Sequence, residues 1–285
     1  MLAEQLTDPI ADHGEGPVWF EHRNELRWVD MLRGIVWVLG ATNASPVRQQ
    51  LPVEVVAAIR PRAAGGAVVA VGKGFAIQPN LDSPSIEIIS VVDVGRASRM
   101  NEGGCDPDGR FYCGTMDETG EATAALFRLD GDHSVTTVLS GVGISNGLGW
   151  SPDNSTAYYV DSVRGQIDMF DYEFHSGLTN RRIFTHIDPD LGAPDGLTVD
   201  REGYVWVAMW DGAAVRRYSP RGILDEAVAV PVSRVTACAF GGDDLDTLYI
   251  TTSAVGVGRS TERRAGALFG VLTGGLGMQP TPYAG

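Results

Sequence analysis

The chain has 285 residues, of which 44% are hydrophobic and 20% are charged, a composition typical of a globular protein with a substantial core. Its formal net charge is −14, from 22 basic and 36 acidic residues, which opposes binding to nucleic acid or to an anionic membrane surface. No apolar stretch approaches the roughly 20 residues of a membrane-spanning helix, and the acidic N-terminus does not resemble a signal peptide. We therefore expect a cytoplasmic protein that acts on a small molecule.

Helical periodicity is almost absent from the chain. Short runs rich in Val, Tyr, Trp and Ile alternate instead with turns that contain Gly, Asp, Pro and Asn, which predicts many short antiparallel strands. Hairpin-like pairs are predicted at residues 26–30 with 34–39, 158–161 with 165–171, and 204–208 with 214–218. The three cysteines (Cys105, Cys113 and Cys238) are too few for a disulfide framework, so we expect buried thiols, with Cys105 and Cys113 able to lie on adjacent strands.

The strands follow a repeat. Each pair is preceded by a further strand that ends at a turn carrying Asp or Asn, and the predicted strand ends are Trp19, Cys105, Trp150, Val199 and Phe240. The last three spacings are 45, 49 and 41 residues, and the first, 86 residues, is about double, with a turn-like segment at 63–66 in the missing place. Six units with about four strands each predict an all-β fold, a six-bladed β-propeller with four-stranded blades in a single domain spanning residues 1–285.

Two features of the ends of the chain follow from this fold. Ring closure should pair an N-terminal strand within residues 2–10 with the last blade, which contains the strands at 248–252 and 267–272. The Gly- and Pro-rich tail from residue 274 to residue 285 is predicted to be loosely held.

Four polar residues recur at an equivalent point of the repeat: Glu15, Asn101, Asn146 and Asp195. Each lies four positions before the end of a first strand, and Val55 and Thr236 occupy the two remaining positions by the same count. Because first strands line the central channel of a propeller, these side chains should ring one mouth of it. Carboxylate and amide oxygens that converge there favour a hard divalent cation such as Ca²⁺, Mg²⁺ or Mn²⁺.

Any one of these residues could instead shape a turn, since Asn146-Gly147 and Pro194-Asp195-Gly196 are common turn sequences. Only the convergence of four of them favours a site. His13 lies two residues before Glu15 and so faces the same side of a strand. We expect it to lie behind the metal ligands or at the surface rather than to bind the metal itself. No Gly-x-Ser-x-Gly motif or phosphate-binding loop accompanies the series.

With these motifs in view, the chain resembles the senescence-marker-protein/regucalcin/gluconolactonase family of six-bladed propellers. The matching stretches occur in family order at residues 14–19, 99–103, 106–110, 114–116, 145–150, 193–197 and 240–249. The resemblance implies that Glu15, Asn146 and Asp195 ligate one divalent metal. It also implies that Arg99 and Asn101 contact the substrate, and that the substrate is the lactone of a sugar acid.

Two positions depart from the family pattern. Glu102 follows Asn101 where many members have Asp, and Glu118 lies one position early for a substrate-contacting glutamate, so the sugar preference stays open. The cation could be Ca²⁺, Mg²⁺, Mn²⁺, Fe²⁺ or Zn²⁺, because oxygen ligands accept all of them.

The predicted function is hydrolysis of an aldonolactone to an aldonic acid, with Asp195 as general base. Three alternatives are a regucalcin-like calcium-binding protein without turnover, a phosphotriesterase-like hydrolase on the same scaffold, and a protein-interaction propeller. The sequence does not fix the oligomeric state.

Overall fold

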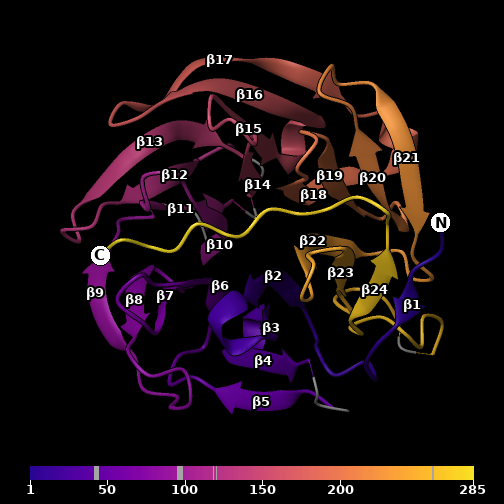
Figure 1. Cartoon of the computed structure of the whole chain (residues 1–285), viewed down its shortest axis with the longest axis horizontal. Coiled ribbons are helices and arrows are strands. Elements are labelled where there is room, and N and C mark those ends of the chain that lie inside the picture. Colours follow the sequence, from indigo (N-terminus) through magenta and orange to yellow (C-terminus); the bar gives the residue numbers. More distant parts are fainter. Residues whose placement is uncertain (42–44, 95–98, 118, 120, 259) are drawn as a thin grey trace.

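The fold is a ring of six antiparallel four-stranded sheets around a central axis, as Figure 1 shows. The computed structural model describes residues 1–41, 45–94, 99–117, 119, 121–258 and 260–285. The predicted six-bladed β-propeller with four-stranded blades is therefore confirmed. Glu118, to which the sequence assigned no role, lies outside the described residues.

The blades follow one another along the chain, and in blades 1 to 5 the strands run in sequence order from the channel outward. Blade 1 contains β2 (Gly14–Phe20), β3 (Glu25–Asp30), β4 (Ile35–Gly40) and β5 (Val47–Gln50); blade 2 contains β6 (Val56–Pro61), β7 (Ala67–Val71), β8 (Gly74–Gln78) and β9 (Glu87–Val91); blade 3 contains β10 (Arg99–Cys105), β11 (Phe111–Met116), β12 (Ala124–Leu129) and β13 (Val135–Val142).

The second half of the chain builds the other three blades. Blade 4 contains β14 (Ser145–Trp150), β15 (Thr156–Asp161), β16 (Gln166–Glu173) and β17 (Gly177–His186); blade 5 contains β18 (Ala193–Val199), β19 (Val205–Trp210), β20 (Ala214–Tyr218) and β21 (Leu224–Ala229); blade 6 contains β22 (Val235–Gly241), β23 (Thr247–Thr252), β24 (Phe269–Leu272) and β1 (Glu4–Gln5). Short 3₁₀ turns connect strands at η1 (Glu21–Arg23), η2 (Met31–Arg33), η3 (Ser162–Arg164) and η4 (Pro189–Leu191).

The ring closes through the N-terminal strand, as predicted. β1 is the outermost strand of blade 6 and pairs antiparallel with β24, with Glu4 opposite Gly270 and Gln5 opposite Phe269. The last blade thus combines both ends of the chain, which ties the first blade to the sixth.

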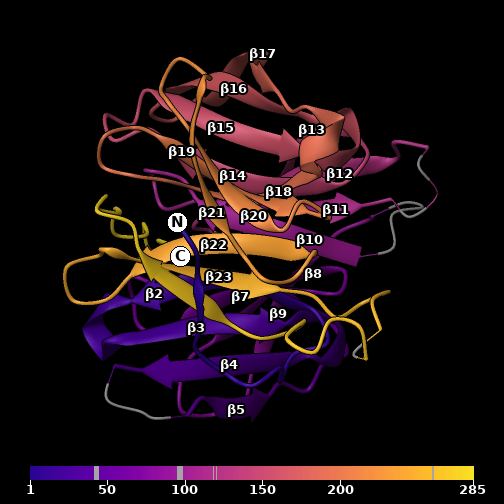
Figure 2. The same cartoon turned by 90° about the vertical axis from the view of Figure 1, so that its right-hand side faces the viewer.

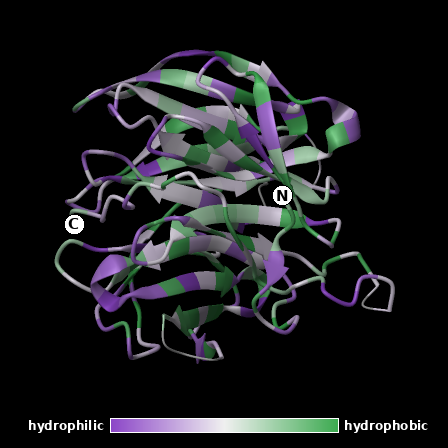
Figure 3. Ribbon diagram, turned by 45° about the vertical axis from the view of Figure 1, so that its right-hand side comes forward, coloured by the Kyte–Doolittle hydropathy of each residue, from purple (hydrophilic) through white to green (hydrophobic). Residues whose placement is uncertain are grey.

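The core lies between neighbouring blades, where the faces of the sheets pack together. Every residue of β7 is buried, and hydrophobic segments run along the strands throughout the ring in Figure 3. The innermost strands β2, β6, β10, β14, β18 and β22 contact one another around the axis. Small residues fit this crowding, since a Cβ on Gly147 of β14 would lie 2.5 Å from the backbone nitrogen of Leu197 on β18.

The three cysteines are free and buried, and Cys105 on β10 and Cys113 on β11 lie on adjacent strands, as the sequence suggested. Among the described residues, no helix has the length and apolar character needed to cross a membrane.

The C-terminal tail contradicts its prediction, because it is firmly attached. It crosses one end of the channel from blade 6 to blade 3 (Figures 1 and 2). At one side the backbone N–H of Gly277 donates to Leu245. At the other side Tyr283 is fully buried, its backbone N–H donates to Pro61 and its hydroxyl donates to the carbonyl oxygen of Asp130 at 2.7 Å. The Gly- and Pro-rich tail is therefore an extended segment that crosses the end of the channel, and it is not a free end.

Truncation of the Tyr283 side chain tests this attachment. Tyr283→Ala should lower the free energy of unfolding by about 3 kcal/mol, because it removes a fully buried aromatic ring. Tyr283→Phe should cost only about 1 kcal/mol, since it removes the hydrogen bond and keeps the ring. Urea denaturation of both variants measures the difference. Equal stability of Tyr283→Ala and the unmodified protein would mean that the tail is loosely held after all.

Candidate functional site

A β-bulge interrupts each innermost strand close to the mouth where these strands begin. The register between the first and second strands shifts between Glu15 and Val18, Met100 and Gly103, Ser145 and Leu148, and Pro194 and Leu197, and also in β6 and β22. Each of the four named shifts adds one residue to the inner strand. A bulge leaves residues unpaired and re-aims their side chains. Three of the four predicted polar residues lie inside these bulges, and Glu15 lies at the edge of the fourth.

The other two blades carry no charged side chain at this level. In β22, Thr236 occupies the bulge, where its buried hydroxyl donates to the carbonyl oxygen of Gly14 at 2.6 Å. In β6 the corresponding residue is Ala57, between Val56 and Ala58, so Val55 lies just before the strand. The count along the sequence was therefore two residues early in blade 2, since its first strand ends at Pro61, four positions after Ala57.

The four polar residues of the series are buried at one mouth of the channel. Their exposed fractions are 2% for Glu15, 4% for Asn101, 5% for Asn146 and 6% for Asp195. Carboxyl and amide groups are rarely this buried unless they have hydrogen-bond partners or a bound ion.

Hydrogen bonds connect Asn101 with Asn146 of the series and with two residues outside it. The Nδ2 of Asn101 donates to the carbonyl oxygen of Ser145 at 2.8 Å and to Oδ1 of Asn146 at 3.4 Å. The guanidinium of Arg99 donates to Oδ1 of Asn101 at 2.6 Å. The Nδ2 of Asn146 donates to the hydroxyl of Ser162 at 2.9 Å, which orients its oxygen side away from that contact. The structure thus brings Arg99, Asn101 and Asn146 into one network.

The two carboxyl groups complete the cluster. Burial raises the pKa of Glu15 to about 7, although the backbone N–H of Gly16 donates to its Oε2 at 2.8 Å. Burial, and then the negative charges of Glu15 and Glu102, hold the pKa of Asp195 well above its usual range. Oδ1 of Asp195 is buried and has no hydrogen-bond partner among the described residues. These groups are close enough to oppose one another's ionisation.

Two further aspartates position the loops that enter the site, and the sequence reasoning missed their role. Oδ1 of Asp30 accepts from the backbone N–H of His13, and its Oδ2 accepts from that of Asp12. Asp161 does the same in blade 4 for Gly143 and Ile144. Each ends the second strand of its blade in a repeated aromatic-Val-Asp sequence, and that repetition was the available signal.

His13 is buried rather than at the surface, and its Nδ1 lies 2.8 Å from the hydroxyl of Ser253. Burial, and then the positive charges of Arg99 and Arg234, lower its pKa to about 3. The imidazole is therefore neutral at physiological pH. It lies beside Trp210 in an edge-on contact with ring centroids 6.0 Å apart.

The arrangement fits a divalent cation only if amide oxygens take part. Among the described residues, no group of three or more His, Cys, Asp and Glu side chains is arranged to hold a metal ion. Glu15 and Asp195 supply two carboxylates, and Asn146 supplies an amide oxygen beside them, which is the donor type that hard cations take. The unpartnered Oδ1 of Asp195 is the observation in favour of such an ion.

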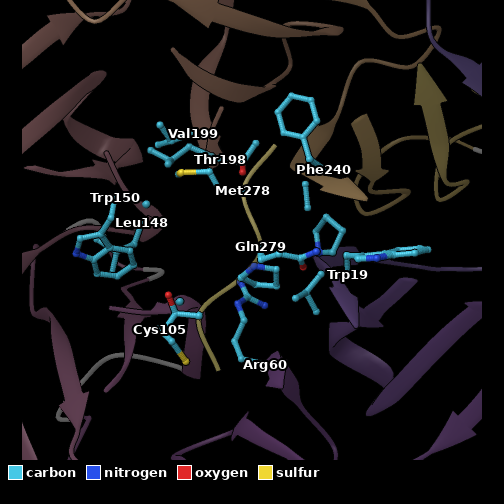
Figure 4. A pocket seen from close by; sticks show the side chains of 18 of the residues that line it. Trp19, Arg60, Cys105, Leu148, Trp150, Thr198, Val199, Phe240, Met278 and Gln279 are labelled. Carbon is cyan, nitrogen blue, oxygen red and sulfur yellow. The ribbon is translucent and has the colours of Figure 1, made fainter. Parts of the chain in front are cut away.

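A cavity of about 180 Å³ occupies the other half of the channel. The later residues of the inner strands line it, and the C-terminal tail covers it through Met278 to Thr281 (Figure 4). Two charged side chains line it, Arg60 and Glu102, and Arg60 extends toward the tail. The channel therefore has a polar mouth at one end and a covered chamber at the other.

The electrostatics of Glu15 predict how stability depends on pH when chelator removes divalent cations. Its pKa is raised from an ordinary value of 4.5 to about 7, so its contribution to stability is complete below about pH 4.5 and is lost as the pH rises through 7. The free energy of unfolding should fall between pH 5 and pH 8 by on the order of 2 kcal/mol from this group. Glu15→Gln should flatten the slope, measured by thermal unfolding. An unchanged slope would show that Glu15 is not buried as a neutral acid.

Comparison with known proteins identifies the family of the chain. Residues 13–254 match the family model described as SMP-30/Gluconolactonase/LRE-like region. Regucalcin of Danio rerio is 36% identical over 285 residues, covering 95% of each chain.

Solved structures give the same result. A luciferin-regenerating enzyme superposes with a TM-score of 0.90 and 28% identity over 99% of both chains. Regucalcin from Agrobacterium tumefaciens, described as a calcium-binding protein, superposes with a TM-score of 0.91 and 22% identity over 99% of this chain and 97% of its own. The family match begins two residues before Glu15 and ends two residues after β23, the second strand of blade 6. On this match, the chain belongs to the SMP-30/gluconolactonase/LRE-like family.

Proposed function

We propose that this protein is a metal-dependent hydrolase that opens the lactone ring of a sugar acid. The observation that carries the proposal is the convergence of two buried carboxyl groups, Glu15 and Asp195, with two asparagine amides at one mouth of the channel. Membership of a family whose description includes gluconolactonase supports it. A polyhydroxylated lactone suits a mouth that offers the guanidinium of Arg99 and the amide of Asn101.

Glu15, Asn146 and Asp195 would hold one divalent cation. Ca²⁺, Mg²⁺, Mn²⁺, Fe²⁺ and Zn²⁺ all accept such oxygen ligands, and availability decides among them. When bound, the cation supplies Lewis-acid polarisation of the lactone carbonyl and offsets the negative charge that develops on its oxygen. It would also relieve the repulsion between the two carboxylates.

The residues of the chain would perform the proton transfers and hold the substrate. Asp195 accepts a proton from the attacking water as the water oxygen forms a bond to the carbonyl carbon. The ring C–O bond then breaks, and the departing ring oxygen takes up a proton to become a hydroxyl group. Arg99 donates to substrate oxygens while it holds Asn101 in place. The product is an aldonic acid, so the net change is the addition of one water.

A metal-resolved lactone assay tests the proposed function. Glucono-, galactono-, xylono- and arabinono-lactones are offered to the protein, and acid release is followed with a pH indicator. Chelator should abolish turnover above the spontaneous rate, and re-addition of single metals should restore it. Tight calcium binding without turnover of any lactone would favour the non-catalytic alternative, and hydrolysis of phosphotriesters alone would favour the other hydrolase class.

The role of Asp195 has its own test. Asp195→Asn keeps the size of the side chain but removes the base, so kcat should fall by about 10²- to 10⁴-fold. Thr247→Ser, on the second strand of blade 6 and near the opposite end of the channel, serves as a control and should leave kcat unchanged. Full lactonase activity in Asp195→Asn, with metal bound, would exclude Asp195 as the base.

A further inference from the structure

Glu102 takes a place that glycine occupies in the two following blades. In the bulges of β14 and β18 the residue after the polar side chain is Gly147 or Gly196, and in β10 it is Glu102. The glycines are sterically required, since a Cβ on Gly147 would lie 2.5 Å from the backbone nitrogen of Leu197, and one on Gly196 would lie 2.5 Å from Cβ of Ala237. Blade 3 therefore directs a carboxyl group into the channel where its neighbours have no side chain.

This carboxyl group lies beneath the mouth and reaches toward blade 5. Glu102 is 5% exposed, and its Oε2 lies 3.0 Å from the point where a Cβ on Gly196 would be, next to Asp195 in the chain. Oε2 has no hydrogen-bond partner among the described residues. The acceptor is thus buried, free and adjacent to the proposed ligand set.

Arg60 is a positive group in the same part of the channel as Glu102. Both side chains line the chamber that the C-terminal tail covers. Its two hydrogen bonds both use Nη1, which donates to the carbonyl oxygens of Gly16 and Ile59. Within the described part of the chain, no salt bridge joins Arg60 to Glu102. Burial, and then the charge of Glu15, hold the pKa of Glu102 well above its usual range, and the positive charge of Arg60 opposes that shift.

We infer that Glu102 and Arg60 form a charged floor beneath the mouth and adjust its affinity for a divalent cation in opposite directions. This inference rests on the proposed function. A carboxylate below the ligand set attracts the ion and can accept a hydrogen bond from water that accompanies it, as outer groups do at metal sites. A guanidinium at the same depth repels the ion, and burial strengthens both effects, because field lines pass through protein rather than water.

Calorimetric titration of the full-length protein with Ca²⁺ and with Mn²⁺, at one fixed pH, tests the inference. Glu102→Gln should weaken binding about tenfold, and Arg60→Gln should strengthen it several-fold. The double variant should fall between the two. Glu102→Asp keeps the charge and should bind within a few-fold of the unmodified protein. Glu87→Gln, an exposed carboxylate on the outermost strand of blade 2, removes the same charge far from the channel and should have no effect.

The two single variants should change the binding affinity in opposite directions. Damage to the fold would instead weaken binding in both, so the two explanations can be told apart. If Glu102→Gln and Arg60→Gln both weakened binding, or neither changed it, the inference would be overturned. Thermal unfolding in chelator identifies any variant that is misfolded. If Glu102→Gln is misfolded, the cation affinity of Glu102→Asp decides whether the inference holds. If the unmodified protein bound neither ion, the proposed metal site itself would fail, and this inference would fail with it. Binding by the unmodified protein with no response to Glu102→Gln would overturn only the inference.

Discussion

Repulsion between buried carboxyl groups is the constraint on which the rest of the site depends. Glu15 and Asp195 are removed from water at the same mouth, where burial raises the pKa of each and the charge of Glu15 raises that of Asp195 further. A protein gains nothing in stability from such an arrangement unless a proton or a cation offsets it. The surrounding amides of Asn101 and Asn146 add oxygen atoms without adding charge. The proposed cation would offset this repulsion, and the chemistry that we propose follows from what that ion can polarise.

The scaffold creates this constraint by local irregularity rather than by its regular strands. A bulge in each inner strand turns the polar side chains toward the axis, while aspartates such as Asp30 and Asp161 fix the loops that lead into those strands. At the other end of the channel the tail, held by Tyr283, covers a chamber of about 180 Å³. The two ends of the channel have different linings, because the first and the last residues of the inner strands differ in character.

Much of this could be predicted from the sequence, and the failures have physical reasons. The repeat identified six blades and the ends of inner strands, since turn residues such as Asp106 recur at a fixed distance and accept backbone hydrogen bonds. It also placed Glu15, Asn146 and Asp195 at one level. It could not find the attachment of the tail, because Tyr283 is held by contacts with residues more than 150 positions away. Nor could it reveal the bulges, since these depend on how two strands pair, which shifted the equivalent position in blade 2 from Val55 to Ala57.

Diffraction from a crystal soaked in Mn²⁺ is the most direct measurement of the central claim. Anomalous scattering locates the ion independently of any activity and of any assumption about its ligands. The account predicts one strong peak at the mouth of the channel, within bonding distance of oxygen atoms of Glu15, Asn146 and Asp195. A map with no peak among these side chains at a saturating concentration, or with the ion bound elsewhere in the ring, would contradict it.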